Sequence, residues 1–152
     1  MTTVCEQNRR LGLAINEEIW NGRRFERIPL YFCEDFVADY SPRVVRRGHR
    51  EIEQMVRDAH DTFEGFREQV RHVIADESSV VLHFTISGKQ VRNWGPIPAS
   101  NRDVSYDEIV IMHIREGKVS HQVGVADNLL ALQQLGVIAD PAGFAKRSLP
   151  EK

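Results

Sequence analysis

The sequence predicts one α+β domain in which helices come first along the chain and strands follow. Apolar residues recur at intervals of three and four up to about residue 63, and at intervals of two from about residue 70. The length of 152 residues suits one domain, because a second domain would have too little core. Helices followed by strands predict helices packed on one face of a curved antiparallel sheet.

The first half of the chain is predicted to be mainly helical. Asn21-Gly22 is a typical helix end, and Ser41-Pro42 ends an extended segment because the residue before a proline avoids helical geometry. The clearest helical periodicity comes last and predicts a long amphipathic helix. The predicted segments are a helix at 5–20, a short helix from about residue 24, an extended segment at 36–40 and the long helix at 48–63.

The second half is predicted to form four strands and a last helix. Its strands are rich in β-branched residues that alternate with polar ones. Asp127 is a typical N-cap for the helix, and Gly136 ends it. The ordered core is expected to span about residues 6–138, and the tail beyond Asp140 is expected to be loose. The predicted strands lie at 70–75, 80–90, 104–114 and 118 to about 125, and the helix at 127–135.

Charge and hydropathy argue against several kinds of partner. Twenty Lys and Arg residues stand against twenty-two Asp and Glu residues, which leaves no surplus charge for nucleic acid or an anionic membrane. No apolar stretch approaches the roughly 18 residues of a membrane span, and the first residues lack a signal-peptide pattern. We therefore expect a cytoplasmic protein whose partners are small molecules or proteins.

The sequence shows no pattern typical of a metal or cofactor site. Cys5 and Cys33 are far apart and form no C-x-x-C pair, and the six histidines show no H-x-x-x-H grouping. No dinucleotide fingerprint, P-loop or G-x-S-x-G motif occurs. The sequence therefore predicts no metal and no cofactor. His83 and His121 are expected at the surface or at a dimer interface.

Glu108 is the residue that most clearly indicates chemistry. If residues 115–117 form a three-residue hairpin loop, Ile114 faces Lys118 and Glu108 faces Gly124. The even-numbered residues of 104–114 then form an apolar face that Glu108 alone interrupts. Loss of water there raises the pKa of a carboxyl group, and such a group can accept and return protons near neutral pH.

Several blocks of the sequence together resemble the SnoaL-like polyketide cyclase and ester cyclase family, a branch of the nuclear transport factor 2-like superfamily. The order and spacing of the blocks carry the resemblance, which spans most of the chain. Asn101 stands where the family often has Gly, and Asn tolerates left-handed backbone angles best among the other residues. The blocks are Glu18-Ile19-Trp20-Asn21-Gly22, Tyr31-Phe32 through Asp35-Phe36-Val37, Gly95-Pro96-Ile97-Pro98-Ala99-Ser100-Asn101-Arg102, Arg115-Glu116-Gly117-Lys118, and Asp127 with Gln133-Gln134-Leu135-Gly136.

The resemblance implies a cone-shaped sheet around the long helix, with a pocket at the open end, usually in a homodimer. It places the family's catalytic aspartate at Gly124, so that group is missing here. Glu108, expected opposite Gly124, can bring a carboxylate into nearly the same space. Asp39 stands where family members often have a pocket His or Asn. Trp20 matches a pocket tyrosine of the cyclases.

The leading hypothesis is a cofactor-independent cyclase or isomerase that binds a hydrophobic, oxygenated, polyketide-like molecule. Glu108 transfers protons, Tyr106 donates a hydrogen bond, and Asp39 pairs with Glu108 or orients a hydroxyl. The alternatives are a binding module without chemistry and an epoxide-opening hydrolase. Glu108 as a satisfied core carboxylate, Asp39 as a solvated acid and Tyr106 as a packing residue also remain open. The expected substrate-binding residues are Trp20, Tyr31, Met55, Phe84, Trp94, Val110, Met112 and Gln122.

Overall fold

The computed structural model describes residues 1–40 and 44–143. The turn expected at Ser41-Pro42 and most of the tail expected to be loose lie outside these residues. The helices are α1 (Val4–Ala14), continued by a π-helical segment (Ile15–Asn21), then a 3-10 turn (Phe25–Arg27), α2 (Ile28–Tyr31), α3 (Gly48–Thr62) and α4 (Asn128–Gln134). The strands are β1 (Phe32–Tyr40), β2 (Val44–Arg47), β3 (Phe63–Ala75), β4 (Ser79–Gln90), β5 (Asp103–Arg115) and β6 (Lys118–Ala126).

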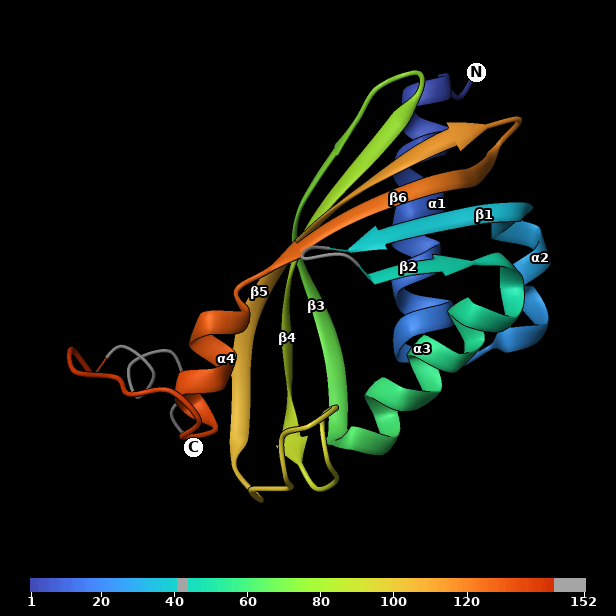
Figure 1. The fold of residues 1–152 in the computed structure, drawn as a ribbon. Helices are drawn as coiled ribbons and strands as arrows, with labels where there is room; N and C mark the ends of the chain where they lie inside the picture. The colour runs from blue at the N-terminus through green and yellow to red at the C-terminus, as the bar shows by residue number, and fades with distance from the viewer. Residues whose placement is uncertain (41–43, 144–152) are drawn as a thin grey trace.

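The predicted α+β architecture is confirmed, with one correction to the strand directions. The six strands form one curved sheet in the order β2-β1-β6-β5-β4-β3, and α1, α2 and α3 lie together on one side of it (Figure 1). The β1–β6 pairing is parallel, whereas the sequence predicted an antiparallel sheet. Strand β6 follows β5 through a hairpin and then lies beside β1. Because β1 and β6 are not consecutive in the chain, they can run parallel. No helix in the described part of the chain is long and apolar enough to cross a membrane.

Helix α3 follows the predicted pattern and packs against the sheet. Ile52 and Val56 are buried on its inner face. On its outer face Arg57 bonds to Glu53 at 2.7 Å and lies over the ring of Phe25, with the guanidinium carbon 4.4 Å from the ring centroid. The sheet therefore contacts an apolar stripe while the charged face stays in solvent.

Strand β3 begins seven residues earlier than the predicted 70–75, directly after α3. The register against β4 shifts between Glu64 and Arg67, and Gly65 has a φ of +69°. A β-bulge places two residues opposite one and interrupts the period of two, so alternation could not identify this part of the strand.

The β5–β6 hairpin corrects the predicted register. Its loop has two residues, Glu116 and Gly117, with φ values of 52° and 75°, as in a type I′ turn. A bulge at the pairing of His113 then adds one residue to β6, so Val110 lies opposite Gly124 and Glu108 lies opposite Ala126. The prediction was wrong by two residues. Because side chains alternate with a period of two, Glu108 still faces the inside of the sheet.

Gly124 lies where other side chains crowd its Cα. A Cβ atom added there would lie 2.5 Å from Cε1 of Tyr40 and 2.8 Å from Oε1 of Glu108. The side chains of Tyr40 and Glu108 thus leave no room for a Cβ atom at position 124. This crowding, and not the φ angle, requires glycine there.

We predict that Gly124→Ala lowers the free energy of unfolding by about 1–3 kcal/mol, because Tyr40 must move from a packed position. Urea unfolding measures this loss. Leu30→Ala is the control, because Leu30 is 55% exposed on α2, away from the outer face of the sheet, and its effect should stay within about 0.5 kcal/mol. Equal stability of the two variants would contradict the crowding.

Candidate functional site

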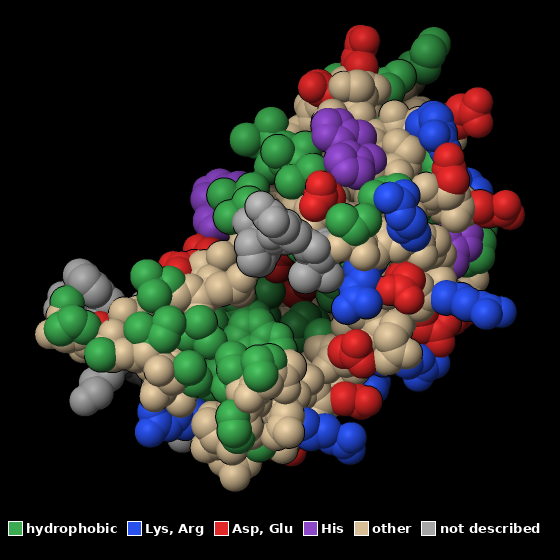
Figure 2. All heavy atoms as spheres, viewed as in Figure 1, with side chains coloured by type: hydrophobic (Ala, Val, Ile, Leu, Met, Phe, Trp, Pro, Cys, Tyr) green, Lys and Arg blue, Asp and Glu red, His purple; other side chains and the backbone are tan. Residues whose placement is uncertain are grey.

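A cavity of about 800 Å³ lies between α3, the π-helical segment and the inner face of the sheet. Figure 2 shows this face of the molecule hollowed beside α3, with hydrophobic side chains gathered in the hollow. The volume is that of a small-molecule site. Nine residues predicted for the site line it: Trp20, Met55, Phe84, Trp94, Tyr106, Glu108, Val110, Met112 and Gln122.

Glu108 presents its carboxyl group to this cavity from the middle of β5. Among the described residues, no side chain or backbone group forms a hydrogen bond or ion pair with that carboxyl. Burial removes water from it and raises its pKa from 4.5 to about 7. A carboxyl group with this pKa is populated in both protonation states at neutral pH, which suits general acid–base catalysis.

Two tyrosines flank Glu108 in the cavity. Tyr106, two residues earlier on the same face of β5, is 6% exposed, and its hydroxyl has no partner in the described part of the chain. The hydroxyl of Tyr40 accepts a hydrogen bond of 2.7 Å from Nε2 of Gln122, which leaves its own proton to donate. Burial, followed by the charge of Glu108, raises the pKa of both tyrosines, so they remain neutral donors.

Glu68 is a second carboxyl group in the cavity that the sequence did not predict. It is 4% exposed on β3, and its Oε2 accepts a hydrogen bond of 2.6 Å from Nδ2 of Asn16. Burial, followed by the charge of the nearby Glu108, raises its pKa well above 4.5, which favours its protonated form. The alternation of Phe66, Glu68 and Val70 indicates a strand with Glu68 on its apolar face. The bulge before Arg67 interrupts this alternation, so the sequence did not predict a strand there.

Asp39 and Tyr31 do not line the cavity, contrary to the prediction. Asp39 is exposed on the outer face of β1, because its neighbours Ala38 and Tyr40 take the inward positions of the alternation. Tyr31 ends α2, where its hydroxyl donates to Glu18 at 2.6 Å and accepts from Arg27 at 2.9 Å. Neither residue lies beside Glu108.

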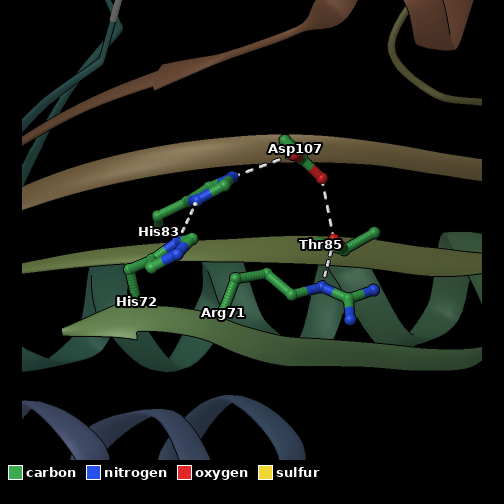
Figure 3. Close-up of polar contacts among 5 residues, drawn as sticks. All are labelled: Arg71, His72, His83, Thr85 and Asp107. Carbon is green, nitrogen blue, oxygen red and sulfur yellow. Dashed lines mark hydrogen bonds and ion pairs between the residues drawn. The ribbon is translucent and has the colours of Figure 1, made fainter.

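The outer face of the sheet carries a separate polar cluster (Figure 3). Nε2 of His83 lies 2.8 Å from Oδ2 of Asp107, and its Nδ1 lies 3.0 Å from Nδ1 of His72. Thr85 donates to the other oxygen of Asp107 at 2.8 Å and accepts from Arg71 at 3.0 Å. This cluster occupies the opposite face from Glu108. Within the described residues, no three His, Cys, Asp or Glu side chains form a group that could hold a metal ion.

We predict that the difference in stability between wild type and Glu108→Gln depends on pH. The folded state raises the pKa of Glu108 from 4.5 to about 7, so it binds more protons than the unfolded state between these values. The stability of wild type therefore falls as the pH rises through this window, by up to about 3 kcal/mol, and the neutral Gln variant lacks this loss.

Urea unfolding of both proteins at pH 5 and pH 8 measures the difference. Glu18→Gln is the control, because hydrogen bonding from Tyr31 and the charge of Arg27 lower the pKa of Glu18, so its titration lies below both pH values. A difference between wild type and Glu108→Gln that is the same at both pH values would show that Glu108 is solvated.

Known proteins resemble this chain in sequence pattern and in fold. The profile of the SnoaL-like polyketide cyclase family matches residues 12–135. No curated protein sequence matches the chain. A structure of a proposed SnoaL-like polyketide cyclase from Jannaschia sp. CCS1 superposes with a TM-score of 0.81 and 16% identity, over 93% of this chain and 98% of that one.

Two Streptomyces structures have the same fold. TsrD from Streptomyces laurentii gives a TM-score of 0.77 at 22% identity, over 87% of this chain and 96% of that one. AclR, a proposed hydroxylase from Streptomyces galilaeus, gives 0.77 at 18% identity, over 95% of each chain. Identities this low establish the fold, and the functional names differ between neighbours. The family match covers most of the chain, which therefore belongs to the SnoaL-like polyketide cyclases, with the nuclear transport factor 2-like fold.

Proposed function

We propose that the protein is a cofactor-independent cyclase or isomerase that acts on a hydrophobic, oxygenated, polyketide-like molecule in the cavity. The single observation that carries this proposal is the Glu108 carboxyl, which lines the cavity, forms no hydrogen bond or ion pair with any described residue and has a pKa raised to about 7. Buried polar groups in folded proteins usually have partners, and an unpaired one facing a cavity is a candidate for contact with a ligand.

In the proposed reaction, the Glu108 carboxylate removes a proton from a carbon next to a carbonyl group. The electrons of the C–H bond move to the carbonyl oxygen, and the Tyr106 hydroxyl donates a hydrogen bond to that oxygen. The resulting enolate either takes the proton back from Glu108 at another carbon that is conjugated with it, which isomerises the substrate, or attacks a second carbonyl carbon, which closes a ring. In the second case the carbonyl π electrons move to its oxygen, and the new alkoxide takes the proton from Glu108. Glu108 returns its proton in both cases, so no cofactor is consumed.

The missing aspartate at Gly124 is compatible with this role for Glu108. Oε1 of Glu108 would lie 2.8 Å from a Cβ at Gly124, so its carboxyl group occupies the space beside that position. The carboxyl group of Glu108 on β5 can occupy this space only because Gly124 on β6 has no side chain.

We predict that Glu108→Gln lowers the turnover of a test ketone by about 100-fold or more, because Gln cannot accept the proton. The probe is 2-tetralone in deuterated buffer, and proton NMR follows enzyme-dependent uptake of deuterium at C1. Asp107→Asn is the matched control, because Asp107 is adjacent in sequence and lies on the opposite face. Wild-type exchange rates in Glu108→Gln would exclude Glu108 as the base.

The alternative of a binding module without chemistry is supported by Gly124, where the family's acid is missing. Saturable binding of the ketone with no exchange in wild type would favour that alternative. The epoxide-opening alternative paired Glu108 with Asp39, and Asp39 does not line the cavity.

We also propose that the protein is a homodimer, as expected from its family. The outer face of the sheet exposes large apolar side chains, including Ile109 at 49% and Val125 at 61%. We predict twice the chain mass of 17.5 kDa by size-exclusion chromatography with light scattering. Ile109→Glu should shift the mass toward one chain, because the new charge would lose its water in the interface. A monomeric wild type would contradict the proposal.

A further inference from the structure

Glu68 has no role in the reaction described above, yet it lines the same cavity as Glu108. Its side chain is 4% exposed, and among the described residues no Lys, Arg or His forms an ion pair with it. Burial without a counter-charge favours the neutral form of a carboxyl group, which has a proton to give.

The contacts of Glu68 determine where that proton points. Oε2 accepts from Nδ2 of Asn16, and Oδ1 of Asn16 lies 3.4 Å from the donating Nδ2 of Asn21, which fixes the orientation of the Asn16 amide. Oε1 of Glu68 has no partner in the described part of the chain and is not enclosed by protein atoms. In its protonated form Glu68 therefore carries the proton on Oε1, because Oε2 accepts from Asn16, and its side chain lines the cavity.

The backbone of Glu68 is held as firmly as its side chain. Nδ2 of Asn21 donates to the carbonyl oxygen of Glu68 at 2.9 Å, and the N–H of Glu68 donates to Oδ1 of Asn21 at 2.8 Å. Strand β3 is the edge of the sheet, so no neighbouring strand is available for these two groups. Asn16 and Asn21 lie five residues apart in the π-helical segment, whose hydrogen bonds span the same interval. That segment therefore brings both asparagines to Glu68.

Glu68 and Glu108 influence each other through their charges. The negative charge of Glu108 raises the pKa of Glu68, and the two groups also act together on Tyr40 and Tyr106. When Glu108 takes a proton, its charge disappears and Glu68 can lose a proton more easily. Uptake at one carboxyl group thus favours release at the other, while the net charge of the cavity stays constant.

We propose that Glu68 is the general acid that acts with Glu108 as the base. This inference rests on the proposed function. As Glu108 removes a proton from carbon, Oε1 of Glu68 gives its proton to the carbonyl oxygen, so the substrate becomes a neutral enol. The new Glu68 carboxylate keeps the hydrogen bond from Asn16. When Glu108 returns its proton to carbon, Glu68 recovers its proton from the enol oxygen, and both residues are restored.

A titration of the wild-type protein tests the first requirement without any substrate. Carboxyl-detected NMR, with signals assigned by comparison with Glu68→Gln and Glu108→Gln, should show Glu68 protonated throughout the range in which Glu108 ionises. In Glu68→Gln the midpoint of Glu108 should stay unchanged, because a neutral amide replaces a neutral acid. A Glu68 signal that is ionised at pH 7 would overturn the proposal.

The second requirement is that Glu68→Gln slows proton transfer. Uptake of deuterium by 2-tetralone measures this rate. We predict that Glu68→Gln lowers the maximal exchange rate by about 100-fold with little change in the ketone concentration for half saturation. In wild type the rate should rise through about pH 7 as Glu108 ionises and fall at higher pH as Glu68 loses its proton. The fall should be missing in Glu68→Gln. Glu64→Gln is the matched control on the same strand, because Glu64 is exposed.

The outcomes separate this proposal from the proposed function. Loss of exchange in Glu108→Gln with a wild-type rate and pH profile in Glu68→Gln would overturn only the role of Glu68. Wild-type rates in both variants would overturn both proposals. If Glu68→Gln does not fold, Asn16→Leu serves instead, because it removes the hydrogen bond to the Glu68 carboxylate and should slow exchange. An Asn16→Leu variant with the wild-type rate would then contradict the proposal.

Discussion

Two buried carboxyl groups that line one cavity and form no ion pair with any described residue are the constraint on which the rest of this structure depends. Burial raises the pKa of Glu108 to about 7 and raises the pKa of Glu68 well above its usual value. Such groups are costly to bury unless they remain protonated or meet a ligand. The sheet, the π-helical segment and α3 enclose the space that imposes this cost, and the same enclosure makes both groups useful for proton transfer.

Strand alternation decides which acids enter the cavity. Glu108 and Asp107 are adjacent in sequence, yet one faces the cavity and the other bonds to His83 on the outer face. The same rule excludes Asp39, whose neighbours Ala38 and Tyr40 point inward. Because a shift of two residues preserves alternation, the register error in the β5–β6 hairpin changed the residue opposite Glu108 but not its face.

Irregular backbone supplies the parts of the site that regular patterns do not reveal. A bulge near Gly65 lets β3 begin directly after α3 and aims Glu68 inward. The π-helical segment brings Asn16 and Asn21 onto this edge strand, where they bond to its side chain and backbone. Departures from ideal helix and strand geometry often occur at functional sites, and here they position one carboxyl group.

The sequence by itself determined the helix–strand order, the amphipathic face of α3 and the inward face of β5, because these follow from local periodicity. It also identified nine of the residues that line the cavity, among them Glu108 as a lone acid on that face. Tertiary structure alone decided the parallel β1–β6 pairing, the hairpin register and the position of Glu68 in the cavity. Each of these depends on a bulge, a turn or a contact between segments far apart in the chain, such as Asn16 and Glu68, and local periodicity has no information about such contacts.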